Sequence, residues 1–413
     1  MTRVDPIIAS MQPADRQSFR RRVFYIPGYD PIHPRRYREL YRKEGGEQAA
    51  LSGYSLKLLP KVAKGGYGWR VEGEIDGTKT TAEVEVLVWS DLVRSSMQTG
   101  IAATYLQLIR TAWAYIGTGA LIRLMRLRKG PMIAALYPIG VLILQLCIAL
   151  LAAWGLYRLG ALLHPLIGAG LGLAVIPAVL NLFRRHDNRI FAYYLMHDYA
   201  YAAQFHGANP PELEARMEEF RATIAAAMSP DCDEVLLVGH SSGAHLGVSI
   251  LADLIRHGLP DHGPALSFLT LGQVVPMVSF LPGARRLRGD LHYLSQRAEV
   301  TWVDVTAPGD GCAFALCDPV AVTGVAPQNK RWPLVISAAF TQTLSPERWR
   351  SLRWRFFRLH FQYLCAFDNL SNGPGDYDYF RITAGAQTLS QRYRDRAPSK
   401  SRIEVPLSPY RTI

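Results

Sequence analysis

Ser241 is the residue of this 413-residue chain whose neighbours point most directly to chemistry. It lies in the stretch "EVLLVGHSSGAHLG", with Gly239 two positions before it and Gly243 two positions after it. Small residues on both sides allow a turn tight enough to hold a serine hydroxyl clear of its neighbours, as a nucleophile requires. Because Gly-x-Ser-x-Gly is a short pattern that also arises by chance, its context must decide between a nucleophile and an ordinary turn serine.

The elements around Ser241 favour the nucleophile. Residues 234–238 form an apolar run typical of a parallel strand buried on both faces. From Ala244 to His257, apolar residues recur at helical spacing: Leu246, Ile250, Leu251 and Leu254. The motif therefore lies where a strand gives way to a helix. In that position the N–H of Ser242 and the helix N-terminus would face an oxyanion.

A nucleophilic serine needs a histidine base, and in a sheet of this kind the base follows the acid in the chain. Beyond His292 the sequence contains one further histidine, His360, in "FFRLHFQYL". We therefore expect His360 to accept the proton of Ser241. The alternative is a hydrogen-bonded histidine at the start of a helix.

Three aspartates compete for the role of the acid that orients His360. Asp310 follows the expected strand "VTWVDVTA" in a loop with Pro308 and Gly309, where a carboxylate can turn inward. Asp304 lies on that strand and Asp318 precedes Pro319. We favour Asp310, with Asp304 as the main alternative.

The stretch "VLLVGHSSGA" resembles the serine pattern of lipases and esterases of the α/β-hydrolase superfamily. The order Ser241, Asp310, His360 is also similar to the order of that superfamily's catalytic triad. The resemblance covers residues 20–90 and 190–385, and its specific part is the motif around Ser241. It implies a serine hydrolase that forms an acyl-enzyme, and we expect neither a metal nor another cofactor.

Members of that superfamily supply a second oxyanion N–H from a loop after an early strand, and "RRVFYIPGYDP" resembles such a segment. Residues 23–26 are expected to form the strand, and Gly28 would let the backbone approach the substrate. The resemblance thus assigns the second donor to the N–H of Tyr29. No His-Gly pair precedes this loop as in many esterases, so an ordinary Pro-Gly turn is the alternative.

The remaining pattern predicts an α/β fold with a mostly parallel sheet covered by helices on both faces. "YSLKLLPKV" and "WRVEGEIDG" favour an antiparallel hairpin, and "AEVEVLVWSD" a further strand. Later strands are expected in "ALSFLTLG", "TWVDVTA" and "WPLVISAAF", and helices in residues 187–206 and 210–228. The segment "GQVVPMVSFLPGARRLRGD" is expected either to line an acyl pocket or to be an apolar strand end.

Residues 131–183 are apolar enough for a transmembrane hairpin inserted into the hydrolase domain. Arg158 is the one formal charge in this range, and it separates stretches of 27 and 25 residues. A helix crosses the hydrocarbon core in about 20 residues. We expect the turn of the hairpin at Arg158, with Trp154, Tyr157 and Arg158 at the far interface. Gly168 and Gly172 are expected at a close helix contact. A hairpin entering one leaflet, or a buried soluble hairpin, is the alternative.

Residues 101–130 are expected to form amphipathic helices that lie in the membrane interface. Apolar residues recur there at helical spacing: Leu106, Ile109, Trp113, Ile116, Ala120, Leu124 and Leu127. Arginines follow towards the end of the segment. An ordinary helix that packs on the sheet would show the same spacing.

Charge and topology place the protein on a membrane surface in this interpretation. Basic residues flank the hairpin on both sides, which by the positive-inside rule places the hydrolase domain and both termini in the cytoplasm, at a bacterial inner membrane. The formal net charge of +12 suits anionic head groups. No basic and aromatic recognition module supports nucleic acid as a partner. Five cysteines without metal-ligand spacing suit a reducing compartment.

The expected organisation has an N-terminal segment (1–20), two parts of a hydrolase domain (21–100 and 184–392) and a flexible tail (393–413), with the helical insertion between the two parts. The expected function is cleavage of a lipid or lipid-like ester. An acyltransferase with the same triad, or a non-catalytic membrane scaffold, would share these features.

Overall fold

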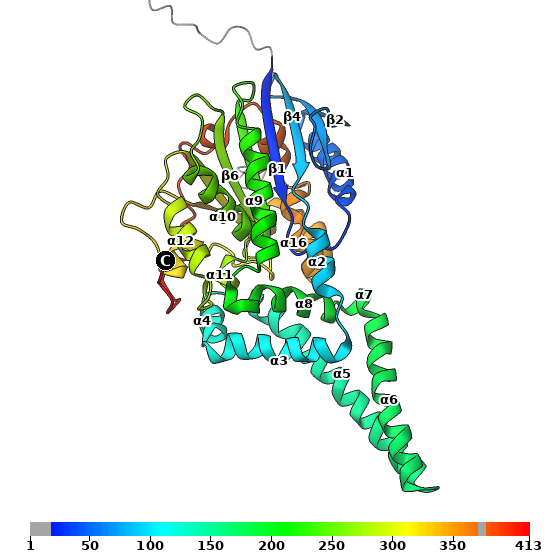
Figure 1. The fold of residues 1–413 in the computed structure, drawn as a ribbon. Coiled ribbons are helices and arrows are strands. Elements are labelled where there is room, and N and C mark those ends of the chain that lie inside the picture. The colour runs from blue at the N-terminus through cyan, green and yellow to red at the C-terminus, as the bar shows by residue number, and fades with distance from the viewer. Residues whose placement is uncertain (1–17, 371–376) are drawn as a thin grey trace, which may run out of the picture.

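The computed structural model describes residues 18–370 and 377–413, so most of the expected N-terminal segment lies outside the described residues. Its centre is one eight-stranded sheet with the order β2-β3-β4-β1-β5-β6-β7-β8 (Figure 1). β4, β1, β5, β6, β7 and β8 pair in parallel, whereas β2 and β3 join antiparallel at one edge. The expected α/β class with a mostly parallel sheet is confirmed. The strands are β1 Phe19–Ile26, β2 Ser55–Pro60, β3 Gly68–Ile75, β4 Thr78–Val86, β5 Glu234–His240, β6 Ala265–Leu271, β7 Val300–Thr306 and β8 Leu334–Ser337.

Helices cover both faces of the sheet because successive side chains of each buried strand point to opposite sides. In β1, Phe24 and Ile26 pack into one apolar cluster, and Val23 and Tyr25 into the other. The first face is covered by α2 Ser90–Met97, α9 Pro211–Ala226, α10 Gly243–Arg256 and α12 Arg285–Leu294. The second face is covered by α1 Arg35–Ser52, α14 Phe340–Thr343, α15 Pro346–Leu352, α16 Phe356–His360, α17 Tyr379–Ala384 and α18 Leu389–Arg392.

A further group of helices lies beyond the end of the sheet at which the parallel strands finish (Figure 1). α8 is the nearest of the long helices to the strands, and α3 packs against its other side. This group comprises α3 Ile101–Gly117, α4 Ala120–Leu127, α8 Ala192–Ala203, α11 Val275–Ser279 and α13 Pro319–Thr323. The loops that follow the strands are therefore enclosed between the sheet and these helices.

Two long apolar helices, α5 Lys129–Ala161 and α6 Pro165–Arg185, pack against each other and project away from the body (Figure 1). Both are long and apolar enough to cross a membrane, and α7 Asp187–Ile190 returns the chain to α8. Gly168 lies at their contact as expected, because an added Cβ there would lie 2.5 Å from the carbonyl oxygen of Tyr157. The turn differs from expectation. α5 continues through Arg158 to Ala161, and α6 begins at Pro165, a residue that suits the first turn of a helix.

The apolar residues expected at helical spacing between Leu106 and Leu127 lie on two helices, α3 and α4, and in two different environments. On α3 the series points outward, and the side chain of Trp113 is 74% exposed. On α4 the series points inward, where Ala120, Leu124 and Leu127 are buried in an apolar cluster that also contains Met277 of α11. The helices separate at Gly119, whose φ of 69° lies in the left-handed region. The apolar residues of this series on α3 are thus left uncovered among the described residues, whereas those on α4 are covered by other helices and loops and not by the sheet.

Two other segments differ from expectation. The segment "GQVVPMVSFLPGARRLRGD" is not a strand end: it forms α11 and α12, since Pro276 suits the first turn of a helix. In place of a free tail, residues 393–413 run along the body. The N–H of Ile403 donates to Leu316 at 2.7 Å and that of Leu407 to Val322 at 3.0 Å. These backbone hydrogen bonds satisfy polar groups that a free tail would leave to water.

Candidate functional site

The candidate site lies at the carboxyl ends of β1, β5 and β7, where parallel strands deliver their following loops to one edge of the sheet. β1 leads to Gly28 and Tyr29, β5 leads to Ser241, and β7 leads to the loop with Asp310. His360 comes from the end of α16 on the second face. The fold thus gathers residues that are more than 300 positions apart in the chain.

Ser241 occupies the turn between β5 and α10 with a φ of 56°, a value that non-glycine residues rarely adopt. Its N–H donates to the carbonyl of Leu271 at 2.9 Å, which fixes the turn against β6. The flanking glycines are required by space: an added Cβ at Gly239 would lie 2.7 Å from the carbonyl oxygen of Gly243, and one at Gly243 would lie 2.2 Å from that of Ile26. The local packing therefore enforces the strained backbone.

The loop after β1 passes close to Ser241. An added Cβ at Gly28 would lie 3.0 Å from Ser241 Cβ and 3.4 Å from its Oγ. The indole of Trp89 donates to the carbonyl of Pro27 at 3.0 Å and holds the loop in place. In the described part of the chain, the backbone N–H groups of Tyr29 and Ser242 donate no hydrogen bond. Both residues line one small cavity next to the turn that holds Ser241.

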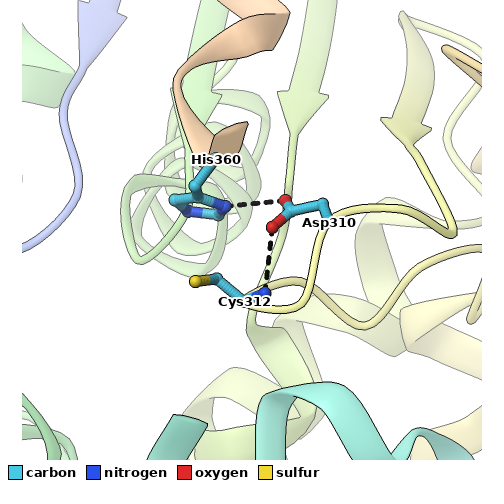
Figure 2. A group of neighbouring side chains, drawn as sticks. All are labelled: Asp310, Cys312 and His360. Carbon is cyan, nitrogen blue, oxygen red and sulfur yellow. Dashed lines mark hydrogen bonds and ion pairs between the residues drawn. The ribbon is translucent and has the colours of Figure 1, made fainter. Parts of the chain in front are cut away.

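His360 and Asp310 form a buried pair in which Nδ1 of the histidine lies 2.7 Å from Oδ2 of the aspartate (Figure 2). The hydroxyl of Tyr363 donates to the same carboxylate oxygen at 3.0 Å and accepts from the N–H of Ala307 at 2.9 Å. The other oxygen, Oδ1, accepts from the N–H of Cys312 at 2.9 Å (Figure 2). Because the carboxylate accepts at Nδ1, the imidazole is held with its Nε2 free to act as a base.

The two competing aspartates have other partners. Asp304 is fully buried in β7, and its Oδ1 accepts from the hydroxyl of Thr270 at 2.6 Å. Burial raises its pKa from 3.8 to about 8, and nearby Asp318 adds to the effect. Asp318 caps α13 by accepting from the N–H groups of Val320 and Ala321. Asp310 alone of the three contacts His360.

The structure does not bring Ser241 Oγ into a hydrogen bond with His360. Nε2 of His360 is buried and has no hydrogen-bond partner among the described residues. The two residues nonetheless contact the same short segment of chain. The N–H of Ser241 donates to the carbonyl of Leu271, and an added Cβ at the next residue, Gly272, would lie 3.0 Å from His360 Cε1. Hydrogen bonds of this kind are often long in the absence of substrate.

Burial and nearby charges act in opposite directions on the ionisation of Asp310. Burial by itself would raise the pKa of Asp310, but the charge of His360 and the hydrogen bonds from His360, Cys312 and Tyr363 hold it below its ordinary value. His240 donates from Nε2 to the carbonyl of His360 at 3.0 Å. Burial, followed by the charge of His360, lowers the pKa of His240 to about 3, so this ring stays neutral and adds no positive charge.

Cys312 completes a group of three potential metal ligands with Asp310 and His360, whose ligand atoms lie within 4.8 Å of one another (Figure 2). The geometry fits the acid and base pair better than a metal site. Burial, then the charges of Asp310 and Asp198, raises the pKa of the Cys312 thiol, whereas a metal requires the thiolate. The Asp310 hydrogen bond also occupies Nδ1 of His360.

Several residues of the site carry no pattern that singles them out in the sequence. Tyr363 lies one helical turn after His360, which is the only sequence indication that it belongs to the pair. Asp198 lies among aromatic residues on α8, and burial raises its pKa to about 7, an effect that the charge of His360 partly offsets. His245 lies on the first turn of α10.

Comparison of the chain with protein-family models, with curated proteins and with solved structures finds no match.

Proposed function

We propose that this protein is a membrane-anchored serine hydrolase that cleaves a lipid or lipid-like ester. The observation that carries the proposal is the strained turn at Ser241, which lies beside the two unused N–H donors and near the buried His360 and Asp310 pair. Non-glycine residues at positive φ are costly and concentrate at functional sites. The arrangement agrees with the α/β-hydrolase resemblance of the motif around Ser241.

The chemistry would proceed in two steps. Nε2 of His360 takes the proton from Ser241 as Oγ attacks the ester carbonyl, and the N–H groups of Tyr29 and Ser242 stabilise the oxyanion. The protonated imidazole then gives its proton to the leaving alcohol, which leaves Ser241 acylated. Water, deprotonated by His360, releases the acid and restores the serine. Asp310 stays ionised and stabilises the imidazolium.

The membrane part of the proposal rests on the outward apolar surface next to α5 and α6. Ile109, Trp113 and Ile116 on α3 are all more than half exposed, although soluble proteins rarely leave large contiguous apolar patches uncovered. α3 lies across the end of the molecule from which α5 and α6 project (Figure 1). We infer that α5 and α6 span the bilayer and that α3 lies in its interface.

The base of the hairpin also adjoins the site. An added Cβ at Gly130, in the first turn of α5, would lie 3.2 Å from Cα of Gly311, next to Asp310. The ring of Phe191, which follows α7, lies 5.3 Å from that of Phe357 on the helix that carries His360. A substrate held in the membrane would therefore have a short path to Ser241. Exposed basic residues at this base, among them Lys129 and Arg185, suit a cytoplasmic, anionic leaflet.

A fluorophosphonate probe tests the proposal on the detergent-solubilised protein. We expect Ser241 to be labelled, and we expect the Ser241→Ala and His360→Ala variants to lose the labelling. Ser95→Ala, which removes an exposed serine on α2, is the matched control and should be labelled like the parent. A folded parent protein that takes up no label would contradict the proposal.

A further inference from the structure

A small cavity lies beside Ser241 on the side of the two proposed oxyanion donors. It is enclosed by α8, the start of α9 and the first turn of α10, and Tyr29 and Ser242 form part of its wall. Trp89, Tyr201 and Leu213 supply apolar surface. A molecule whose carbonyl oxygen is bound by these two N–H groups would therefore extend into this cavity or end at its mouth.

Three polar groups line this cavity and lack partners. Asp198 makes no hydrogen bond or ion pair with any residue in 18–370 or 377–413. The hydroxyl of Tyr201 and Nδ1 of His245 are buried, and within the same ranges neither has a hydrogen-bond partner. Buried polar groups are nearly always paired, so the Tyr201 hydroxyl and His245 Nδ1 indicate a ligand that pairs them. The partly exposed carboxylate of Asp198 lines the same cavity.

The electrostatic surroundings place this ligand next to the reacting groups. The charge of His360 lowers the pKa of Asp198, so this carboxyl group lies within electrostatic reach of the base that would protonate a leaving alcohol. Burial raises the pKa of Asp198 to about 7 and lowers that of His245 to about 4. His245 is therefore neutral at neutral pH, with one ring nitrogen donating and the other accepting.

Hydroxyl groups match this set of partners best, because a hydroxyl both donates and accepts. Two neighbouring hydroxyl groups can together donate to Asp198, accept from the Tyr201 hydroxyl, and either donate to or accept from His245 Nδ1. An ammonium group would only donate and would leave the tyrosine hydroxyl hydrogen without an acceptor. An alkyl group would leave all three unpaired, and this would weaken its binding relative to a hydroxylated one.

We propose that Asp198, Tyr201 and His245 form a subsite for a hydroxyl-bearing alcohol portion of the ester, of which the glycerol head of a lipid is the simplest kind. This inference rests on the proposed hydrolase function. It makes Asp198 a specificity-determining residue, since its carboxylate would contact the substrate directly. The substrate would then be a partially acylated polyol and not a simple alkyl ester.

Three esters with one acyl chain test the subsite: 1-octanoylglycerol, methyl octanoate and octanoylcholine. We expect Asp198→Asn and Tyr201→Phe each to lower the ratio of kcat/KM for the glycerol ester over the methyl ester by about 10-fold. Both changes preserve side-chain shape. Asp261→Asn, at an exposed position after α10, is the matched control and should keep the parental ratio. Thermal unfolding of each variant verifies the fold.

The outcomes separate the two proposals. An unchanged ratio in both variants, with esters still cleaved and Ser241 still labelled, would overturn the subsite alone. A loss confined to octanoylcholine would overturn the hydroxyl assignment in favour of a cation. A parent protein that is neither labelled nor active on any of the three esters would overturn the hydrolase function and this inference with it.

Discussion

His360 and Asp310 are paired at 2.7 Å although 50 residues separate them in the chain. The pair depends on two separate elements, the loop after β7 and the last turn of α16. The hydroxyl of Tyr363 also donates to Asp310 there. Both side chains are buried, so water does not compete for the hydrogen bond. The orientation of the imidazole is therefore a property of the fold and exists before any substrate binds.

Asp310→Asn should lower kcat by a factor on the order of 10³ to 10⁴, because the amide cannot stabilise the imidazolium and favours the wrong tautomer. Asp304→Asn is the control, since Asp304 pairs with Thr270 and not with His360. The activity of Asp304→Asn should stay within about 3-fold of the parent. This change is smaller than the loss expected when a hydrogen bond to a charged group is removed. Ester hydrolysis by the two purified variants measures both effects. Equal losses would contradict the assignment of Asp310 as the acid.

Tyr363→Phe removes one hydrogen bond to Asp310 Oδ2 and the acceptor of the Ala307 N–H. A hydrogen bond to a charged group contributes about 1.5–3 kcal/mol, so kcat should fall by about 10-fold or more while KM stays the same. Tyr363 acts through Asp310 and is a positioning residue. A rise in KM at unchanged kcat would show instead that the tyrosine hydroxyl affects substrate binding.

The strand and helix that flank Ser241 could be predicted because each obeys a local rule. The apolar run before the serine forms β5, and the apolar spacing after it forms α10. The two glycines could be predicted for the same reason, since a tight turn leaves no space for a Cβ at either position. The sheet class follows from the alternation of such segments, and the length of α5 and α6 follows from their apolar composition.

The partners of these elements could not be predicted, because they depend on tertiary contacts. The choice of Asp310 over Asp304 depends on where α16 ends relative to β7, and no periodicity specifies that. Asp198 becomes significant only when α8 packs across the ends of the strands. The turn between α5 and α6 was expected at Arg158, but a single charge does not end a helix, and a proline does start one.

Gly28→Ala should lower kcat by about 10-fold, because small displacements of a reacting group are costly. The added methyl group would lie 3.0 Å from Ser241 Cβ and would push the loop and the serine apart. Gly46→Ala is the matched control, since an added Cβ there meets no atom within 4 Å. It lies inside α1, where alanine favours the helix by up to about 1 kcal/mol. Equal activity of the two variants would contradict a close approach of the loop to Ser241.

The buried Asp304 should make stability depend on pH. Burial raises its pKa from 3.8 to about 8, so the folded protein holds a proton there that the unfolded chain releases. The stability from this group is complete below pH 3.8 and is lost as the pH rises towards 8. The free energy of unfolding should therefore rise for Asp304→Asn relative to the parent by up to about 1.4 kcal/mol per pH unit in this window. Parallel unfolding profiles for parent and variant between pH 5 and 8 would contradict a protonated Asp304.

Leu162 offers a test of how deeply α5 and α6 enter the bilayer, because it lies in the turn between them and is 82% exposed. In membrane vesicles, a Leu162→Cys variant should react with a membrane-impermeant maleimide only from the side opposite the sheet domain, since α5 is long enough to carry the turn across. The native Cys147 near the middle of α5 is the internal control, because hydrocarbon should shield its exposed thiol from reagent on both sides. Reaction of residue 162 from the same side as the domain, or from neither, would mean that the hairpin enters one leaflet. The apolar face of α3 would then be the main membrane contact, and Trp113→Glu would release the protein from vesicles. With a hairpin that spans the bilayer, the same substitution would weaken the packing of α3 in the interface but leave the protein in the membrane.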